Sequence, residues 1–446
     1  MKRITILLLF ACTITGAFAQ DITGKWYGWM EGSGIKLRVG FEIEQTENGY
    51  TAKMTSPDQT NQKIPVSSVA LEDSMLKINI LQMMFGFQGV IKSDSLIEGK
   101  CSQMGQEFTL NLTRTEVRNN RPQTPQEPFP YLQDSLMFEN KEAGIKLGGT
   151  LTMPDRNGPF PAVILVSGSG AQDRDEHILG HKPFAVLADY LTRRGIAVLR
   201  YDDRGVGASE GIYREASIAD FASDARAAIA YLRQQPNIRK DAVGIIGHSE
   251  GGSIALMLAA DQTVDFAVSM AGMGINGSDL LVLQREALLK ASGMTDEYIK
   301  NYNELMAKSE TLIFNETDSA KLVEQIRELY AGTVLAGQEE LSIRQLNSPE
   351  LRSVIQFDPS LYFPKIKCPL LALNGGKDLQ VTPTENLGAI HEGVPHATVR
   401  LFPELNHLFQ TAKTGNTNEY AQIEETINPE VLSTIAAWIV QLTRTN

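Results

Sequence analysis

Cysteine is scarce in this chain: there are three in 446 residues, Cys12, Cys101 and Cys368. Cys101 and Cys368 lie far apart in different predicted domains, and two such thiols do not make a disulfide framework. No cysteine stands at the short spacings from other cysteines or histidines that zinc sites use. The sequence therefore argues against a disulfide-stapled scaffold and predicts no metal site.

Clustered positive charge is also missing. The formal net charge is −12 at pH 7, and no local run of lysine and arginine offsets it, so we expect no binding to nucleic acid or to anionic membranes. Phosphate-binding loops and dinucleotide fingerprints are absent, so no cofactor is expected. Beyond residue 20 no apolar run is long enough to cross a bilayer, and we expect a soluble mature protein with no membrane span.

The first twenty residues have the pattern of a secretory signal peptide. Lys2 and Arg3 form a positive start, residues 4–11 are apolar, and residues 17–19 (Ala-Phe-Ala) form a small-x-small cleavage site. We therefore expect residues 1–20 to be removed and the protein to be secreted or periplasmic. The stretch that ends at Cys12 faintly resembles a lipobox, which makes a lipoprotein anchor the less favoured alternative.

Residues 21–117 predict a small all-β domain, barrel-like or sandwich-like. Residues 35–44 alternate between apolar and polar side chains, and Asn48-Gly49 favours a hairpin turn after them. Gly24-Lys25-Trp26 weakly resembles the G-x-W signature that opens lipocalin-type barrels. Such aromatic residues more often close a barrel than bind a ligand. Further short strands are expected at residues 66–71, 75–80, 87–91, 96–101 and 108–112.

Four prolines in residues 118–130 predict an extended linker and a domain boundary. Residues 131–446 then alternate strand and helix patterns, and the strands are apolar with little alternation, as in a parallel sheet covered on both faces. A helical insertion at about residues 277–351 predicts a cap. The expected strands lie at residues 145–153, 162–166, 196–200, 243–246, 266–270, 370–373 and 398–402, with helices between them such as 184–194 and 218–234.

Residues 243–255 carry the strongest motif of the chain. A β-branched run meets the pentapeptide Gly247-His-Ser249-Glu-Gly251, and an apolar helical stretch follows. This is the G-x-S-x-G nucleophile elbow in its required strand–turn–helix context. Reversing direction at one residue strains Ser249, and its neighbours two places away crowd together, so only glycine fits at those positions. The pattern predicts an exposed Ser249 hydroxyl above the sheet.

Residues 132–446 resemble an α/β-hydrolase, specifically the bacterial esterases related to serine aminopeptidases. The resemblance implies a mostly parallel sheet flanked by helices, with a helical cap over the site. It is carried by residues 166–175 (VSGSGAQDRD), 201–209 (YDDRGVGAS), 247–251 (GHSEG), 374–378 (NGGKD) and 405–409 (LNHLF).

In this family the resemblance implies a triad in the chain order Ser, Asp, His. Ser249 is the expected nucleophile. His407 follows the last strand and is the expected general base. Asp378 follows the strand before it and is the expected carboxylate, with Asp279 as the alternative because some relatives place the acid there.

Acyl transfer also needs two backbone N–H groups for the oxyanion. Glu250, which follows the nucleophile, is expected to supply one. By analogy with the family's H-G-x loop, Ser169 is expected to supply the other. Because this chain has Ser167 where many relatives have histidine, Gly170 remains the alternative donor. The neighbouring charged residues 173–175 and 202–204 are interpreted as a salt-bridged scaffold for this loop, with Arg204 as a candidate partner.

The resemblance implies a serine hydrolase that cleaves carboxylic esters through an acyl-enzyme; the signal peptide predicts that it is secreted, and the apolar helical cap favours short acyl groups. Its expected partner is a small-molecule ester. A serine aminopeptidase or amidase acting on small aminoacyl substrates remains the alternative, and it would need an acidic cap residue for the α-ammonium group. A non-catalytic ligand-binding protein is the alternative from a different class. The cap offers Glu286, Asp296, Glu297 and Glu304 as acids, and the sequence distinguishes none of them.

Overall fold

The computed structural model describes residues 21–32, 35–57, 60–103 and 105–444. The predicted signal peptide and Cys12 lie outside these residues. The described chain divides into two compact units, one up to Arg118 and one from Asn119 onward.

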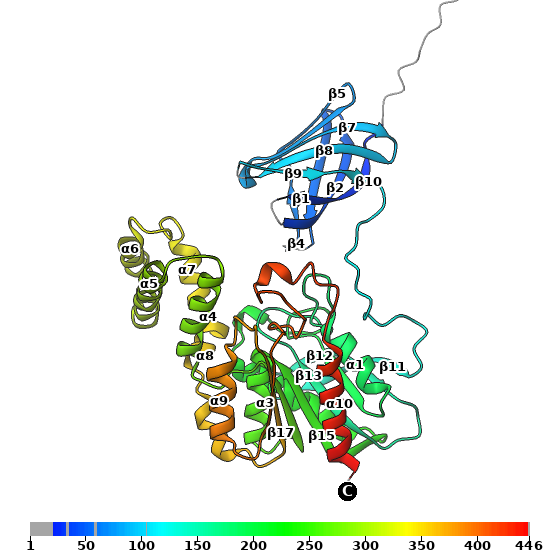
Figure 1. Ribbon diagram of the computed structural model, residues 1–446, viewed down its shortest axis with the longest axis vertical. Coiled ribbons are helices and arrows are strands. Elements are labelled where there is room, and N and C mark those ends of the chain that lie inside the picture. Colours follow the sequence, from blue (N-terminus) through cyan, green and yellow to red (C-terminus); the bar gives the residue numbers. More distant parts are fainter. Residues whose placement is uncertain (1–20, 33–34, 58–59, 104, 445–446) are drawn as a thin grey trace, which may run out of the picture. The chain divides into compact units, whose positions relative to one another are not determined.

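The first unit is a closed antiparallel barrel, which decides between the two expected β architectures (Figure 1). The barrel closes because β1 pairs with β9 and β10 as well as with β2. The hairpin expected at Asn48-Gly49 joins β2 to β3, with Thr46 opposite Gly49. The strands are β1 (Gly24–Gly32), β2 (Ile35–Thr46), β3 (Gly49–Ser56), β4 (Thr60–Pro65), β5 (Ser68–Glu72), β6 (Met75–Ile80), β7 (Phe85–Ser93), β8 (Leu96–Gln103), β9 (Gln106–Leu110) and β10 (Leu112–Thr113).

Trp26 is part of the barrel's core. Its side chain is buried, and its indole N–H donates to the carbonyl of Ile22. The guanidinium of Arg114 lies 3.7 Å from the centre of the indole ring. The indole is therefore occupied by contacts within the barrel.

The second unit is an eight-stranded sheet with helices on both faces, and the α/β-hydrolase fold is confirmed. The strand order is β11-β12-β14-β13-β15-β16-β17-β18; β11 and β12 are antiparallel to their neighbours, and the remaining pairs are parallel. The strands are β11 (Leu132–Asn140), β12 (Ile145–Met153), β13 (Phe160–Val166), β14 (Ala197–Tyr201), β15 (Ile238–His248), β16 (Phe266–Met270), β17 (Leu370–Gly375) and β18 (Thr398–Phe402).

Side-chain alternation along the strands divides the interior of this unit into two cores. On β13, Ile164 belongs to a core with α2, α3 and α9, whereas Val163 and Leu165 belong to a core with α1 and α10. Helices therefore cover both faces of the sheet, which explains why its central strands are apolar throughout. The helices are α1 (Pro183–Thr192), α2 (Ile218–Gln234), α3 (Glu250–Ala260), α9 (Pro383–Gly393) and α10 (Pro429–Arg444).

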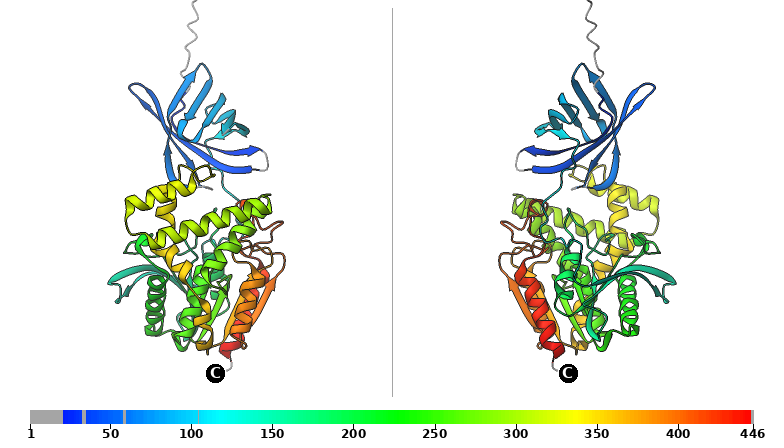
Figure 2. Two further views of the ribbon diagram at one scale, coloured as in Figure 1. Left: turned by 90° about the vertical axis from the view of Figure 1, so that its left-hand side faces the viewer. Right: turned by 90° about the vertical axis from the view of Figure 1, so that its right-hand side faces the viewer.

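The insertion between β16 and β17 is helical, as expected of a cap. Figure 2 shows its helices gathered at the end of this unit opposite to the end where the chain terminates. Thr295, Asp318 and Ser348 each cap a helix by accepting backbone N–H groups. Part of the cap has its own apolar cluster around Ile326 and Tyr330. The cap helices are α4 (Gly277–Ala291), α5 (Asp296–Asn315), α6 (Ser319–Tyr330), α7 (Glu339–Leu346) and α8 (Pro349–Gln356).

The proline-containing segment predicted as a linker is held against the second unit. Arg121 donates to the carbonyls of Leu179, Ala421 and Ile423. The Gln123 side chain donates to one backbone carbonyl and accepts from two backbone N–H groups in the segment before α10. Residues 119–130 thus belong to the α/β unit by their contacts, because the side chains of Arg121 and Gln123 bond partly buried backbone groups there.

Candidate active site

Ser249 lies at a strained turn between β15 and α3. Its backbone angles are φ 55° and ψ −118°, a region that residues with a Cβ rarely occupy. A Cβ on Gly247 would collide with the carbonyl of Gly251, and a Cβ on Gly251 would collide with the carbonyl of Val166. The two glycines are therefore required by close backbone approach, as the motif predicts, and they hold Ser249 where the strand meets the helix.

The backbone N–H groups around Ser249 separate into bonded and available donors. Gly168 N–H donates to Glu176 and Gly170 N–H donates to Glu350, at 2.9 and 3.0 Å. In the described part of the chain no acceptor is recorded for the N–H of Ser169. Glu250 is the first residue of α3, and its N–H has no acceptor within the helix. Ser169 and Glu250 border the same cavity as Ser249, so they are the two available donors.

His407 and Asp378 form a buried pair. Nδ1 of His407 lies 2.7 Å from Oδ2 of Asp378, and the other carboxylate oxygen accepts the N–H groups of Gln380 and Val381. With Nδ1–H donating to the carboxylate, a neutral imidazole keeps Nε2 as a free base. The structure thus brings Asp378 to His407. Asp279, the alternative acid, is exposed on α4, where it bonds the side chain of Asn276.

The other histidines differ from His407 in their surroundings. His177, His391 and His396 are exposed. His181 is buried, and burial followed by the nearby charge of Arg121 lowers its pKa to about 4, so it is neutral at physiological pH. His248 is buried inside the elbow between Glu176 and the carbonyl of His407.

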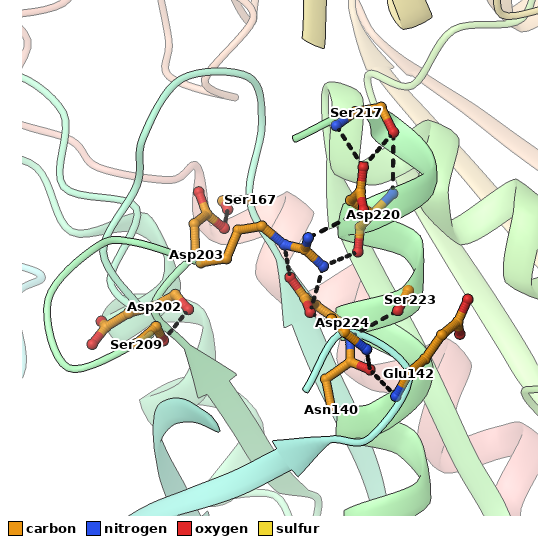
Figure 3. Close-up of polar contacts among 12 residues, drawn as sticks. Asn140, Glu142, Ser167, Asp202, Asp203, Ser209, Ser217, Asp220, Ser223 and Asp224 are labelled. Atoms are coloured by element: carbon orange, nitrogen blue, oxygen red, sulfur yellow. Dashed lines mark hydrogen bonds and ion pairs between the residues drawn. The ribbon is translucent and has the colours of Figure 1, made fainter. Parts of the chain in front are cut away.

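Charged residues brace the loop that contains Ser169, as expected, but with a different pairing from the one predicted. Arg174 pairs with Asp202 at 2.6 Å, whereas Arg204 pairs with Asp220 and Asp224 on α2. Arg204 does not reach residues 173–175 because its turn faces α2, where Asp224 lies between Asn140, Ser223 and Asp220 (Figure 3).

Asp203 ties the same loop to the end of β14. Its carboxylate accepts from the Ser167 hydroxyl and from the Gln172 N–H, both at 2.9 Å, and Figure 3 shows Ser167 beside it. Burial raises the pKa of Asp203 to about 7. Ser167 therefore fastens this loop to Asp203 at the end of β14.

A cavity of about 920 Å³ opens above Ser249. The cap contributes Leu280 and Leu281 from α4 and residues of α7 and α8 to its lining. Most apolar residues of α4 and α5 do not line this cavity. Ile313, for example, packs inside the cap.

Two carboxyl groups, Glu250 and Glu350, border this cavity. Glu350 on α8 accepts from the Gly170 N–H and from the Tyr213 hydroxyl. The side chain of Glu250 is buried, and one of its oxygens has no hydrogen-bond partner in the described part of the chain. Burial, followed by the charges of Glu350 and Asp203, raises the pKa of Glu250 to about 8.

Sequence reasoning did not identify Glu176 or Glu350 as residues of the site. Glu176 follows a charged run, and Glu350 lies in the first turn of an amphipathic helix, where an acid is an ordinary choice for helix stability. Neither stands at a motif position. Only the packing of the cap and of the loop after β13 brings them to Ser249.

Within the described ranges, no group of three or more His, Cys, Asp or Glu side chains could hold a metal ion. Across those same ranges, no helix has the length and apolarity needed to cross a membrane.

Several known proteins similar to this chain are named as hydrolases. Esterase EstD of Thermotoga maritima is 25% identical over 318 residues, which cover 70% of this chain and 70% of the esterase. The 2,6-dihydropseudooxynicotine hydrolase of Paenarthrobacter nicotinovorans is 26% identical over 161 residues, 36% of this chain and 41% of that enzyme. Among solved structures, the Pyrococcus furiosus esterase Pf2001 aligns with a TM-score of 0.45 at 17% identity, covering 73% of this chain and 98% of that one.

The model of the X-Pro dipeptidyl-peptidase (S15) family matches residues 143–407, more than half of the chain. This span begins just before β12 and ends at the histidine that pairs with Asp378. The chain therefore belongs to the X-Pro dipeptidyl-peptidase (S15) family and is a serine hydrolase of the α/β-hydrolase fold.

Proposed function

We propose that this protein is a secreted or periplasmic serine hydrolase that cleaves carboxylic esters of short acyl chains, with Ser249 as nucleophile. One observation supports the proposal: the strained Ser249 follows His248, whose ring bonds the carbonyl of His407, and His407 forms a buried pair with Asp378. The signal-peptide pattern of residues 1–20 supports export.

In the proposed reaction, Nε2 of His407 takes the proton of the Ser249 hydroxyl as Oγ bonds to the ester carbonyl carbon. The carbonyl electron pair moves to oxygen, and the oxyanion accepts the N–H groups of Ser169 and Glu250. Collapse breaks the bond to the alcohol, which takes the proton from His407 and leaves the acyl group on Ser249. Water then gives a proton to His407 and attacks the acyl carbon, which releases the acid and restores Ser249.

Three properties favour short esters over polypeptides. The cavity above Ser249 is bounded by cap helices, and its lining includes the apolar residues Met273, Leu280 and Val354. A pocket of this kind suits a small acyl group better than an extended peptide. An ester also has a better leaving group than an amide, so it depends less on accurate protonation by His407.

A second candidate, a serine aminopeptidase or amidase for small aminoacyl substrates, is favoured by the carboxyl groups of Glu250 and Glu350. Both border the cavity that contains Ser249; Glu350 would pair a substrate ammonium group with negative charge, and Glu250, protonated at neutral pH because its pKa is raised to about 8, would accept a hydrogen bond from it. Glu286 and Glu304, two of the cap acids considered from the sequence, do not line this cavity. If this candidate holds, Glu350 is the cap acid that selects the substrate.

One panel of substrates separates the two candidates. We expect kcat/KM on acetyl to decanoyl esters to be highest for the shorter chains and to exceed kcat/KM on aminoacyl anilides under the same conditions. An aminoacyl anilide that exceeds every ester would reverse the assignment. In that case Glu350→Gln should remove the preference, because it keeps the hydrogen bonds to Gly170 and Tyr213 but not the charge.

A further inference from the structure

His248, the residue before the proposed nucleophile, is placed between two hydrogen-bond acceptors. Its Nδ1 lies 2.8 Å from Oε1 of Glu176, and its Nε2 lies 3.0 Å from the carbonyl oxygen of His407. Both side chains are buried: His248 is 6% exposed and Glu176 is 4% exposed. Solvent therefore cannot replace either of these two contacts.

The two contacts fix the charge of the ring. A carbonyl oxygen accepts only, and an ionised carboxylate does too, so each nitrogen of His248 must carry a proton to make both bonds. A neutral imidazole has one N–H and would leave one buried acceptor facing a lone pair. With Glu176 ionised, only the imidazolium satisfies both sides, and the carboxylate supplies the opposite charge; a neutral ring would require the shared proton to lie on Glu176.

The electrostatic surroundings agree with this geometry. Burial acts against the charged ring, but the charge and hydrogen bond of Glu176, the His407 carbonyl and the charge of Asp378 outweigh it, and the pKa of His248 is raised. The ring of His407 is a further titratable group nearby, with its centroid 4.8 Å from that of His248. Phe409 packs against His248 at an angle and brings no charge.

Glu176 and His248 contact the two loops of the proposed site, the loop that contains Ser169 and the loop that contains His407. Oε1 of Glu176 also accepts the N–H of Gly168, next to the available N–H of Ser169. His248 holds the backbone of His407 itself. Glu176 adopts a positive φ of 51°, an unfavourable conformation for a residue with a side chain, which its buried contacts maintain.

We propose that Glu176 and His248 form a buried ion pair that positions the Ser169 loop and the His407 loop around Ser249. Both are positioning residues, since they act through Gly168 and through the His407 carbonyl. The inference rests on the proposed function of Ser249 and His407, but the charge of the pair can be tested without measuring activity.

The charge is read directly by NMR of the full chain labelled with ¹⁵N-histidine. At pH 7.5 we expect both ring nitrogens of His248 to be protonated, with the signal assigned by its loss in His248→Gln. His181, which is buried and has a pKa of about 4, provides a neutral histidine in the same spectrum. A His248 ring with one unprotonated nitrogen at pH 7.5 would overturn the proposal, whatever the enzyme's activity.

The positioning role is tested with Glu176→Gln, which keeps an acceptor for Gly168 but removes the charge. We expect kcat on a small activated ester to fall about 10- to 100-fold with little change in KM, because a displaced oxyanion donor acts on the transition state. Glu310→Gln is the control: it removes the charge from a partly buried ion pair, with Arg285 in the cap, and should lower thermal stability while leaving kcat unchanged.

A folded Glu176→Gln protein with wild-type kcat would show that the pair does not position the loops. Failure of the proposed function has a different signature. In that case Ser249→Ala would retain activity, and the protonation of His248 in the wild-type chain would still report on the ion pair.

Discussion

Glu250 contributes to the site through two groups that face different surroundings. Its N–H begins α3 beside Ser249, whereas its carboxyl group is buried close to Asp203 and Glu350. Its raised pKa means that folding favours the protonated acid. Through this carboxyl group, the stability of the α/β unit is linked to pH.

The linkage predicts the effect of Glu250→Gln. The carboxyl group titrates near the ordinary glutamate value of about 4.3 in the unfolded chain and at about 8 in the folded chain. Its contribution to stability is therefore complete below the unfolded pKa and is lost as pH rises through the folded pKa. As pH rises from the unfolded pKa to the folded pKa, we expect the free energy of unfolding of the wild type to fall relative to that of Glu250→Gln. The fall is at most about 1.4 kcal/mol per pH unit. Urea unfolding of both proteins at several pH values measures the difference, and a pH-independent difference would contradict the prediction.

The proposed triad predicts a graded series. Ser249→Ala should lower kcat by about 10⁶-fold without unfolding the protein, and His407→Ala should behave similarly. Asp378→Asn should lower kcat by about 10⁴-fold, because the ring keeps its place but not its tautomer. Asp279→Asn is the control: the exposed Asp279 should affect only the start of α4. Steady-state kinetics on one activated ester checks all four, and a larger loss in Asp279→Asn than in Asp378→Asn would refute the assigned acid.

At the scale of elements, the turn after β14 is fastened to α2 by Arg204. The guanidinium binds Asp224 through two nitrogens and also reaches Asp220. Asp224 is 1% exposed, and burial raises its pKa. The buried Asp224 carboxylate needs the Arg204 guanidinium, because a buried charge without a partner is strongly unfavourable.

Arg204→Met should therefore destabilise the protein by about 3 kcal/mol, since it leaves Asp224 buried without its cation. Arg226 on α2 offers a matched comparison, since its ion pair with Asp261 is exposed on the surface. Arg226→Met should change stability by less than about 1 kcal/mol. Chemical unfolding of the two variants tests the contrast, and equal effects would show that the buried pair adds nothing.

At the scale of the whole molecule, the barrel contributes no residue to the proposed triad or to the two N–H donors. The division between the units falls after Arg118. A chain that begins at Asn119 should therefore fold and hydrolyse a small activated ester at close to the wild-type rate. Complete loss of turnover in a folded protein of this length would show that the barrel is needed for chemistry.

The position of the cut matters because of Arg121 and Gln123. A chain that begins at residue 131 would lose their hydrogen bonds to the carbonyls near Leu179 and to the segment before α10. Each such bond contributes about 1 kcal/mol, so this chain should melt at a lower temperature than the one from Asn119. Thermal unfolding of the two chains compares them, and equal melting temperatures would show that the segment is a free linker.

The sequence by itself determined the parts of the protein that depend on neighbouring residues. Glycines two places from Ser249 dictate the elbow, and local strand patterns give β12, β16 and the edge strand β18 the bounds that the sequence predicts. The edge strand β11 was not predicted, because its side chains are mostly exposed and it forms by pairing with β12, which no local pattern indicates.

Only the tertiary structure decided contacts between distant segments. Asp378 rather than Asp279 meets His407 because it follows β17, the strand beside β18. The Gly170 N–H is occupied because Glu350, 180 positions away, accepts it. Glu176 and His248 form a pair because the loop after β13 folds back onto the end of β15. Such contacts join residues that share no local pattern, and the energy of bringing them together comes from the packing of the whole sheet.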